Sequence, residues 1–339
     1  MKNIIDQIAK KTNLKKEHIS NILKLLEDGS TIPFIARYRK EMTGSADEEV
    51  LREFEEIYNG VKNLQDRKSE VLRLVSERTN LIDELQKSIE DAQSLRELED
   101  IYRPYKEKKK TRATTAVANG LTPLANTIQK AKLTKSEIQK EAKKFLGKDV
   151  KTTDDALQGA KDILAERYAD NPKERSYIRN TMLHHGLLEV KKTKTLDEKG
   201  VYKNFVGSSE KVTYIPSHRY LAIMRGVKEK ELSVKITIDI KRVEEGIKRY
   251  KIPKYAKDSS EYLVEAYVDG LKRLLLPSVE REVHAQLKEK ADLAAINVFG
   301  KNLSQLLITP PVSGKVLLGV DPAFRTGCKL AVIDKDANF

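Results

Sequence analysis

The amino-acid sequence predicts a mainly α protein, with multi-helix N-terminal and central regions, a long helical arm, and the truncated start of an α/β domain. Two observations support this fold class. Successive segments repeat apolar residues at helical spacing after residues that cap helices, whereas only two or three stretches read as strands. Of the 339 residues, 39% are hydrophobic and 34% charged, which suits a helix-rich chain with ordinary cores. We expect domains over residues 1–190, 191–312 and 313–339.

The first elements are short helices. Residues 3–27 hold two apolar-periodic stretches that predict a helical pair, either a helix-turn-helix that reads DNA or a packing unit. Pro33 begins another short helix. Ser45 and Glu48 then match the capping box S-x-x-E, which predicts the start of a long helix.

That long helix carries an apolar stripe with spacings of four and three residues, interrupted at Lys68. The stripe consists of Val50, Phe54, Ile57, Val61, Leu64, Val71 and Val75. A stripe of this kind predicts a helical hairpin or a coiled-coil arm. Helical periodicity continues over residues 81–102, and Pro104 then favours a loop.

Residues 121–185 are again periodic as helices are. Asn171-Pro172 is an N-cap followed by proline at the first helical position, and this helix should end near His184. Because His184 and His185 are adjacent, they do not share a helix face and indicate no metal site.

The following region contains the strand candidates. Residues 187–195 look extended and polar, and we place a domain boundary there. Ser217 is expected to cap a helix that Gly226 closes. Residues 231–240 alternate apolar and polar side chains, which predicts a strand with one solvated face.

Two more helices precede the end of the chain. Ser260 is expected to cap the first, and Pro277 to begin the second, which runs to Leu307. The unbroken apolar run 316–320 suits a strand buried on both faces, because it shows no alternation. Pro322 should stop this strand, since proline cannot extend a central ladder.

A second apolar run, 328–333, follows after a short turn and completes a hairpin. Two strands cannot bury their own faces. The chain ends at Phe339, directly after this hairpin. We therefore expect the chain to be the N-terminal portion of a longer protein.

The positive charge is concentrated in one region. The net charge is +13, and residues 191–312 hold 24 basic and 16 acidic side chains, net +8. This excess indicates either a polyanionic partner, with RNA or DNA first, or a merely solvated lysine-rich surface. Two basic clusters with neighbouring tyrosines are the candidate phosphate-binding residues. They are Lys108, Lys109, Lys110 and Arg112 in the first cluster, and Lys241, Arg242, Lys248, Arg249, Lys251 and Lys254 in the second.

Several classes of protein are disfavoured. No apolar run approaches the ~20 residues of a membrane span, and the N-terminus lacks the apolar core of a signal peptide. Cys328 is the only cysteine, so no intrachain disulfide can form, and we expect a cytoplasmic protein. Neither a structural zinc site, a cofactor nor a small-molecule substrate is indicated.

Five blocks carry a resemblance to a known family. They read IPFIARYRKEMTGSADEEVLREFEEIY, EDIYRPYKEKKKTRATTA, IPSHRYLAIMRG, DGLKRLLLPSVEREV and GVDPAFRTGCKLAVID. They closely resemble the Tex family of bacterial transcription accessory proteins, in the same order and along all 339 residues. The resemblance implies a helical N-terminal region, a central region, and the start of a YqgF domain of RNase H-like type. In the family, helix-hairpin-helix motifs and an OB-type RNA-binding domain follow, and neither is present here.

The resemblance implies a nucleic-acid-binding scaffold of transcription rather than an enzyme. Asp321 matches the first acidic position of RNase H-like sites and is the one candidate for a catalytic metal ligand. Two-metal cleavage needs several carboxylates from separate elements, so a structural role beside Pro322 is the favoured reading. The alternatives are an RNase H-like nuclease that uses Asp321, and a helical platform that docks on RNA polymerase or the ribosome.

Overall fold

The computed structural model describes residues 2–12, 14–77, 83–107, 110–310, 312, 314–323, 325, 327–336 and 338–339. This part of the chain is mostly helical, which confirms the mainly α prediction. Two compact units interleave along the sequence. The first comprises Met1–Thr181 and Asp239–Glu280, and the second Met182–Ile238 and Arg281–Phe339. The division at residues 190 and 312 stays a prediction.

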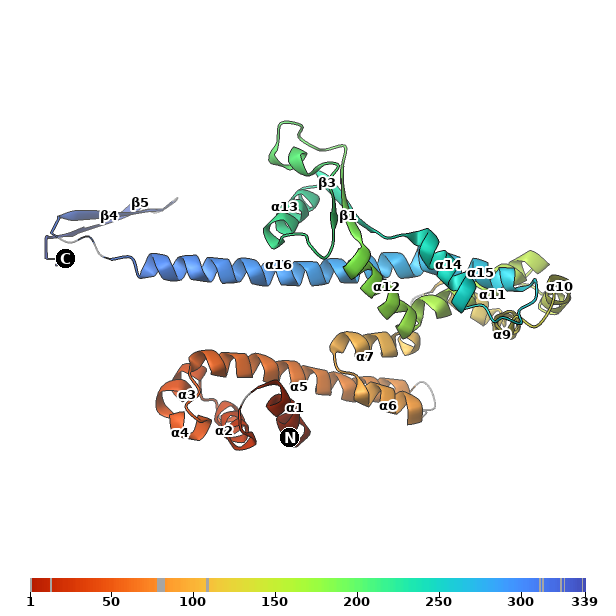
Figure 1. Ribbon diagram of the computed structural model, residues 1–339, viewed down its shortest axis with the longest axis horizontal. Coiled ribbons are helices and arrows are strands. Elements are labelled where there is room, and N and C mark those ends of the chain that lie inside the picture. Colours follow the sequence, from red (N-terminus) through yellow and green to blue (C-terminus); the bar gives the residue numbers. More distant parts are fainter. Residues whose placement is uncertain are drawn as a thin grey trace. The chain divides into compact units, whose positions relative to one another are not determined.

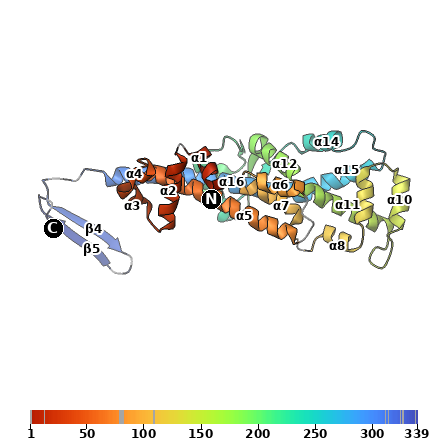
Figure 2. The same cartoon turned by 90° about the horizontal axis from the view of Figure 1, so that it is seen from below.

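The first unit begins with helices arranged along α5 (Figures 1 and 2). Their bounds are α1 Lys2–Lys11, α2 Lys16–Glu27, α3 Ile32–Tyr38, α4 Lys40–Thr43, α5 Glu48–Ser76, α6 Asp83–Asp91 and α7 Leu95–Tyr102. Helices α1 to α3 enclose one core with the first half of α5, around Ile19, Ile35 and Phe54. Helices α6 and α7 pack on its second half, around Val71 and Leu98. The predicted helical hairpin is thereby confirmed.

The start of α5 differs from the prediction. The residue that caps it is Asp47, whose carboxylate accepts a hydrogen bond from the Val50 backbone N–H at 2.9 Å. Gly44 and Ser45 both have positive φ, 68° and 63°, because they form the turn that closes α4. Ser45 is therefore a turn residue, and the predicted S-x-x-E capping box is wrong.

Lys68, which interrupts the apolar stripe, is buried within it. Its ammonium donates to the Glu90 carbonyl oxygen at 2.6 Å, in the last turn of α6. Burial lowers the pKa of Lys68, and the nearby carboxylates of Asp91, Glu97 and Glu90 oppose this shift. A carbonyl at a helix C-terminus is a favourable partner for a cation. The break in the stripe is thus a specific contact between α5 and α6.

The rest of the first unit is built around α11. Its elements are the 3₁₀ turn Arg103–Tyr105, α8 Arg112–Ala118, α9 Thr122–Lys130, α10 Lys135–Lys143, α11 Thr153–Asp170, α12 Pro172–His185, α14 Ile240–Tyr250, α15 Ser260–Asp269 and the π-helix Gly270–Leu275, which leads into α16 Leu276–Leu307. The predicted Asn171 cap is confirmed, since its side chain accepts from the Lys173 N–H at 2.9 Å. The predicted Ser260 cap is wrong, because Ser259 precedes α15 and donates its hydroxyl to the Leu133 carbonyl.

The π-helix brings its backbone very close to α11. A Cβ on Gly270 would lie 2.5 Å from the Ala165 carbonyl oxygen, so no larger residue fits there without movement. A π-helical turn holds one residue more per hydrogen-bonded turn than an α-helix, and such turns occur mostly as short insertions within α-helices. It joins α15 to α16 while α11 packs against both α15 and the π turn.

A largely buried group of charged and polar side chains, the polar cluster, fixes the start of α12. It consists of Asp100, Arg103, Asp170, Arg175, Arg179 and Ser278. The Asp100 carboxylate accepts from Arg175 Nε at 2.9 Å and from Arg179 Nη2 at 2.7 Å. The Ser278 hydroxyl accepts from Arg175 and Arg103 at 3.2 and 3.3 Å. The polar cluster therefore links α7, α11, α12 and the first turn of α16.

The second unit contains a small antiparallel sheet of order β2-β1-β3. Its elements are β1 Leu187–Lys192, the 3₁₀ turn Val201–Phe205, β2 Ser209–Lys211, α13 Ser217–Lys228 and β3 Leu232–Thr237. The predicted one-sided strand is confirmed over Leu232–Thr237, where Leu232 and Ile236 are buried, but it is shorter than predicted because Ile240 begins α14. Gly226 does not close α13, which continues to Lys228. Gly226 lies inside the helix, and glycine suits this position because a Cβ there would lie 2.8 Å from the Leu232 side chain.

The N-terminal cap of α13 also departs from expectation. Ser217 is the first residue inside α13, so the cap position is taken by Pro216 and the predicted Ser217 cap is wrong.

The terminal hairpin pairs β4 Leu317–Ala323 with β5 Gly327–Ile333. Strand β4 continues through Pro322, which is tolerated because this strand is an edge. The run was expected to be buried, yet Leu318 is 62% exposed.

Among the described residues, no helix is both long enough and apolar enough to cross a membrane.

Candidate nucleic-acid interface

The first basic cluster lies at the start of α8. Lys108 and Lys109 fall outside the described residues, and Lys110 is exposed. Arg112 is the first residue of α8 and is exposed as well. Its positive charge acts on Asp162, where it opposes the increase in carboxyl pKa that burial causes. Arg112 is thus within electrostatic range of a carboxylate of the chain itself.

The second basic cluster lies on α14 and in the residues directly after it. This helix begins after Asp239, whose carboxylate accepts from the Arg242 N–H at 3.1 Å. Val243 and Ile247 are buried on one face, so the basic residues are left on the others. Lys241, Arg242, Lys248 and Arg249 are exposed on α14, and Lys251 and Lys254 are exposed just after it. The amphipathic pattern of the helix therefore presents the cluster to solvent.

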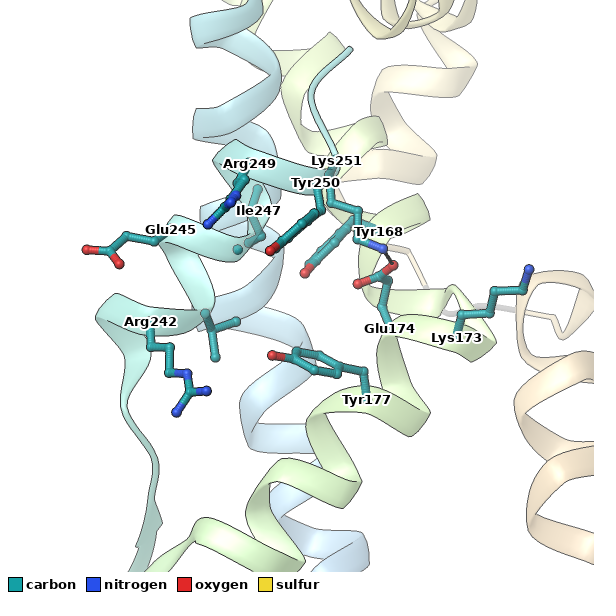
Figure 3. A pocket seen from close by; sticks show the side chains of 12 residues that line it. Tyr168, Lys173, Glu174, Tyr177, Arg242, Glu245, Ile247, Arg249, Tyr250 and Lys251 are labelled. Atoms are coloured by element: carbon teal, nitrogen blue, oxygen red, sulfur yellow. Dashed lines mark hydrogen bonds and ion pairs between the residues drawn. The ribbon is translucent and has the colours of Figure 1, made fainter. Parts of the chain in front are cut away.

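Three of these cations border a groove between α14, α12 and the end of α11 (Figure 3). The groove has a volume of about 610 Å³. Arg242, Arg249 and Lys251 line it from one side. Tyr168, Lys173, Glu174, Tyr177, Glu245 and Tyr250 also line it, with Val243 and Ile247 as its apolar part. Lys110 and Arg112 are not among its described lining residues, so the groove is bordered by cations of the second cluster and not by the described residues of the first.

Tyrosines contributed by separate helices give the groove its aromatic character. Tyr168 comes from α11, Tyr177 from α12 and Tyr250 from the last residue of α14. Tyr177 is 53% exposed and Tyr250 is 73% exposed, whereas Tyr168 is buried. The sequence predicts Tyr250 and Tyr255 as neighbours of these cations, and of the two only Tyr250 lines the groove. The one sequence signal for Tyr177 is that it lies on the predicted helix from Pro172 without belonging to that helix's buried face.

The inner wall of the groove is neutral and hydrogen-bonded. Glu174 is 6% exposed, forms an ion pair with Lys251, and accepts a hydrogen bond from the Tyr168 hydroxyl. Burial, with the charge of Glu174 and its hydrogen bond, raises the pKa of Tyr168, which therefore keeps its proton. The Tyr168 ring also stacks on Tyr267, with centroids 4.8 Å apart. A second pocket of about 350 Å³ shares Tyr168 and Glu174 and extends toward Arg167.

The charge available in the groove is consequently positive. Glu174 is neutralised by Lys251, and Glu244 on α14 pairs with Lys272 at 2.6 Å. Glu245 also lines the groove, so four lining cations, Lys173, Arg242, Arg249 and Lys251, outnumber the two lining carboxylates, Glu174 and Glu245. Within the described part of the chain, five cations of the cluster have no carboxylate partner, and these are Lys241, Arg242, Lys248, Arg249 and Lys254. Lys251 was predicted to bind phosphate, but the structure shows it engaged internally.

Asp321 lies on β4, exposed, and opposite Lys329 in the hairpin register. Among the described residues, no three His, Cys, Asp or Glu side chains come together as a metal ion would need. Asp321 therefore belongs to no such group within the part of the chain that the structure describes.

Comparison with known families matches two regions of the chain. A model of the Tex-like protein N-terminal domain matches residues 2–76, and a model of the Tex central region matches residues 134–299. The two matched ranges together span well over half of the sequence. The groove described above, between α11, α12 and α14, lies within the second range.

Full-length comparison gives relatives in bacteria and in humans. The chain is 43% identical to the uncharacterized protein YdcI of Bacillus subtilis over 97% of its own length and 46% of that protein. It is 33% identical to the transcriptional accessory protein Tex of Neisseria gonorrhoeae, over 98% of the chain and 44% of that protein. It is 30% identical to S1 RNA-binding domain-containing protein 1 of Homo sapiens, over 98% of the chain and 34% of that protein. The chain thus spans less than half the length of these relatives.

Proposed function

This chain belongs to the Tex family, and we propose on that premise that it is a nucleic-acid-binding accessory of transcription whose central region holds RNA or DNA by its phosphates. Support comes from relatives named for transcription and for an RNA-binding domain. Since the chain covers only part of those relatives, the proposal concerns the regions present here. We further propose that components of the transcription machinery are its protein partners.

The observation that carries the proposal is the set of unpaired cations around the α14 groove. Arg242 and Arg249 border the groove without a carboxylate partner in the described chain, and Lys241 and Lys248 add to the same helix. Phosphate contacts by arginine and lysine supply most of the sequence-independent affinity for nucleic acid. A surface used only for solubility would not need exposed tyrosines beside its cations. The aromatic and basic groups together favour nucleic acid.

Binding should be weak, dependent on salt and nearly independent of sequence. If about four cations contact phosphates, log affinity should fall with log salt with a slope of about 3 to 4 in magnitude, since each contact contributes roughly 0.7 to 0.9. We would titrate a labelled single-stranded RNA and a duplex DNA at several salt concentrations. Alanine at Lys108, Lys109 and Lys110 together should lower the affinity and flatten the slope, and should do so alike for different nucleotide sequences. Undetectable binding at low salt would instead favour docking on RNA polymerase or the ribosome.

We expect no nuclease activity from this chain. Asp321 is exposed on an edge strand, and no metal-binding group forms around it in the described residues. Two-metal cleavage requires several carboxylates. Asp321→Asn should therefore leave magnesium-dependent cleavage of labelled RNA and DNA at the background of a no-protein control. Cleavage by the unsubstituted chain that this one change abolishes would support the RNase H-like enzyme instead.

A further inference from the structure

We propose that the groove between α12 and α14 holds one unstacked base at a time, so that this site selects unpaired nucleotides. This inference rests on the proposed nucleic-acid binding and adds the form of nucleic acid that the groove accepts. Two exposed rings carry it. Figure 3 shows Tyr177, from α12, and Tyr250, from α14, on opposite sides of the open space, with Tyr168 behind them.

The exposure of these rings is the first part of the argument. Tyr177 is 53% exposed and Tyr250 is 73% exposed, although both line a cavity. Tyr168, in contrast, already stacks on Tyr267 at 4.8 Å and has its hydroxyl bonded to Glu174. Tyr168 is therefore occupied by the fold, while Tyr177 and Tyr250 remain largely exposed, Tyr250 with the Arg249 guanidinium over its ring. Planar bases stack on such rings whatever their sequence, because every base has a π-face.

The size of the groove is the second part. A volume of about 610 Å³ lies within the range that encloses a single small molecule, roughly 300–1,000 Å³. Its apolar part, Val243 and Ile247, suits the face or edge of one ring system. A double helix offers only stacked edges in its grooves, so its base faces are not accessible to the tyrosines. A paired base would have to leave the stack first, which is unfavourable, whereas an unpaired base needs little or no such change.

The distribution of charge is the third part. Arg249 lies over the Tyr250 ring, with its guanidinium carbon 5.4 Å from the ring centroid. Arg242 borders the groove near the other end of α14. A base between the rings would place its flanking phosphates toward these two cations. The inner carboxylate of Glu174 does not repel them, because Lys251 neutralises it.

The test compares two duplexes that differ by a single nucleotide. One labelled duplex is fully paired, and the other carries one unpaired nucleotide near its centre. Stacking of one base on an aromatic side chain is worth about 5- to 140-fold in affinity, from the usual free energy of such stacking. We expect the bulged duplex to bind tighter than the paired duplex by a factor in this range. A duplex whose bulge is abasic has the same phosphates and should bind like the paired one.

Variants assign the effect to the groove. Tyr177→Ala and Tyr250→Ala should each reduce binding of the bulged duplex toward that of the paired duplex, and leave the paired duplex unchanged. Tyr177→Phe and Tyr250→Phe keep the rings and should keep the preference. Tyr214→Ala is the matched control, because Tyr214 is 76% exposed but belongs to the other unit. Since all three side chains are exposed, circular dichroism should show an unchanged fold.

The outcomes separate the two proposals. If neither duplex binds at low salt, the proposed nucleic-acid binding fails. If both bind equally and both respond to salt, binding by phosphates stands and the base-holding groove is overturned. A preference for the bulge that survives both alanine substitutions would also overturn it, since another surface would then hold the base.

Discussion

Asp100→Ala is expected to lower the free energy of unfolding by about 3–5 kcal/mol, the usual cost of removing one partner from a buried ion pair. Asp100 accepts hydrogen bonds from both Arg175 and Arg179, and the Arg175 side chain is only 1% exposed. Without this carboxylate, two interior guanidinium groups lose their shared counter-charge. Thermal unfolding followed by circular dichroism should show a midpoint lower by roughly 10 °C.

Glu99→Ala provides a matched control for this substitution. Glu99 is the neighbouring residue on α7 and also pairs with an arginine, Arg67, but both side chains are partly exposed, 41% and 27%. Exposed ion pairs contribute less than about 1 kcal/mol. Equal losses from Asp100→Ala and Glu99→Ala would mean that the polar cluster does not anchor α12, and hence does not position the wall that carries Tyr177.

The double substitution Arg242→Ala with Arg249→Ala is expected to weaken binding of single-stranded RNA by about 100-fold at roughly 50 mM salt. Each phosphate contact adds about 0.7 to the salt slope for single strands, which corresponds to about tenfold in affinity at that salt. Both arginines border the groove and have no carboxylate partner in the described chain. Fluorescence anisotropy with a short labelled RNA would measure the loss.

The control for this double variant removes the same charge from a different surface. Lys143 ends α10 and Lys148 follows it, and both are exposed in the same unit. Alanine at both positions lowers the net charge by two, as the arginine pair does. If this control weakens binding as much as Arg242→Ala with Arg249→Ala, overall charge rather than the groove determines affinity.

The sequence was sufficient for elements that local patterns determine. The stripe of α5, the Asn171 cap and the alternation of β3 all depend on residues within a few positions of one another. Local patterns did not decide between two possible N-cap residues for α5. Ser45 and Asp47 are both good N-cap residues, and the choice follows from the turn at Gly44, which places Ser45 at positive φ.

Features that depend on distant residues were missed. The π-helix at Gly270 follows from close packing on Ala165, about a hundred residues earlier. Lys251 looked like any other cation of its cluster, yet Glu174 neutralises it from another helix. The groove forms only because Tyr168 and Tyr177, on other helices, lie beside α14. The spacing of residues within 241–257 contains no information about these neighbours. The sequence therefore located the basic helix but not the aromatic walls beside it.

The salt dependence of RNA binding by the Arg242→Ala, Arg249→Ala variant tests the central claim most directly, because the slope counts phosphate contacts independently of folding yield or label. Two lost contacts should flatten the slope of log affinity against log salt by about 1.4 relative to the unsubstituted chain. The Lys143→Ala, Lys148→Ala control should keep the original slope. An unchanged slope in the arginine variant would contradict the claim that the groove of α14 holds the nucleic acid.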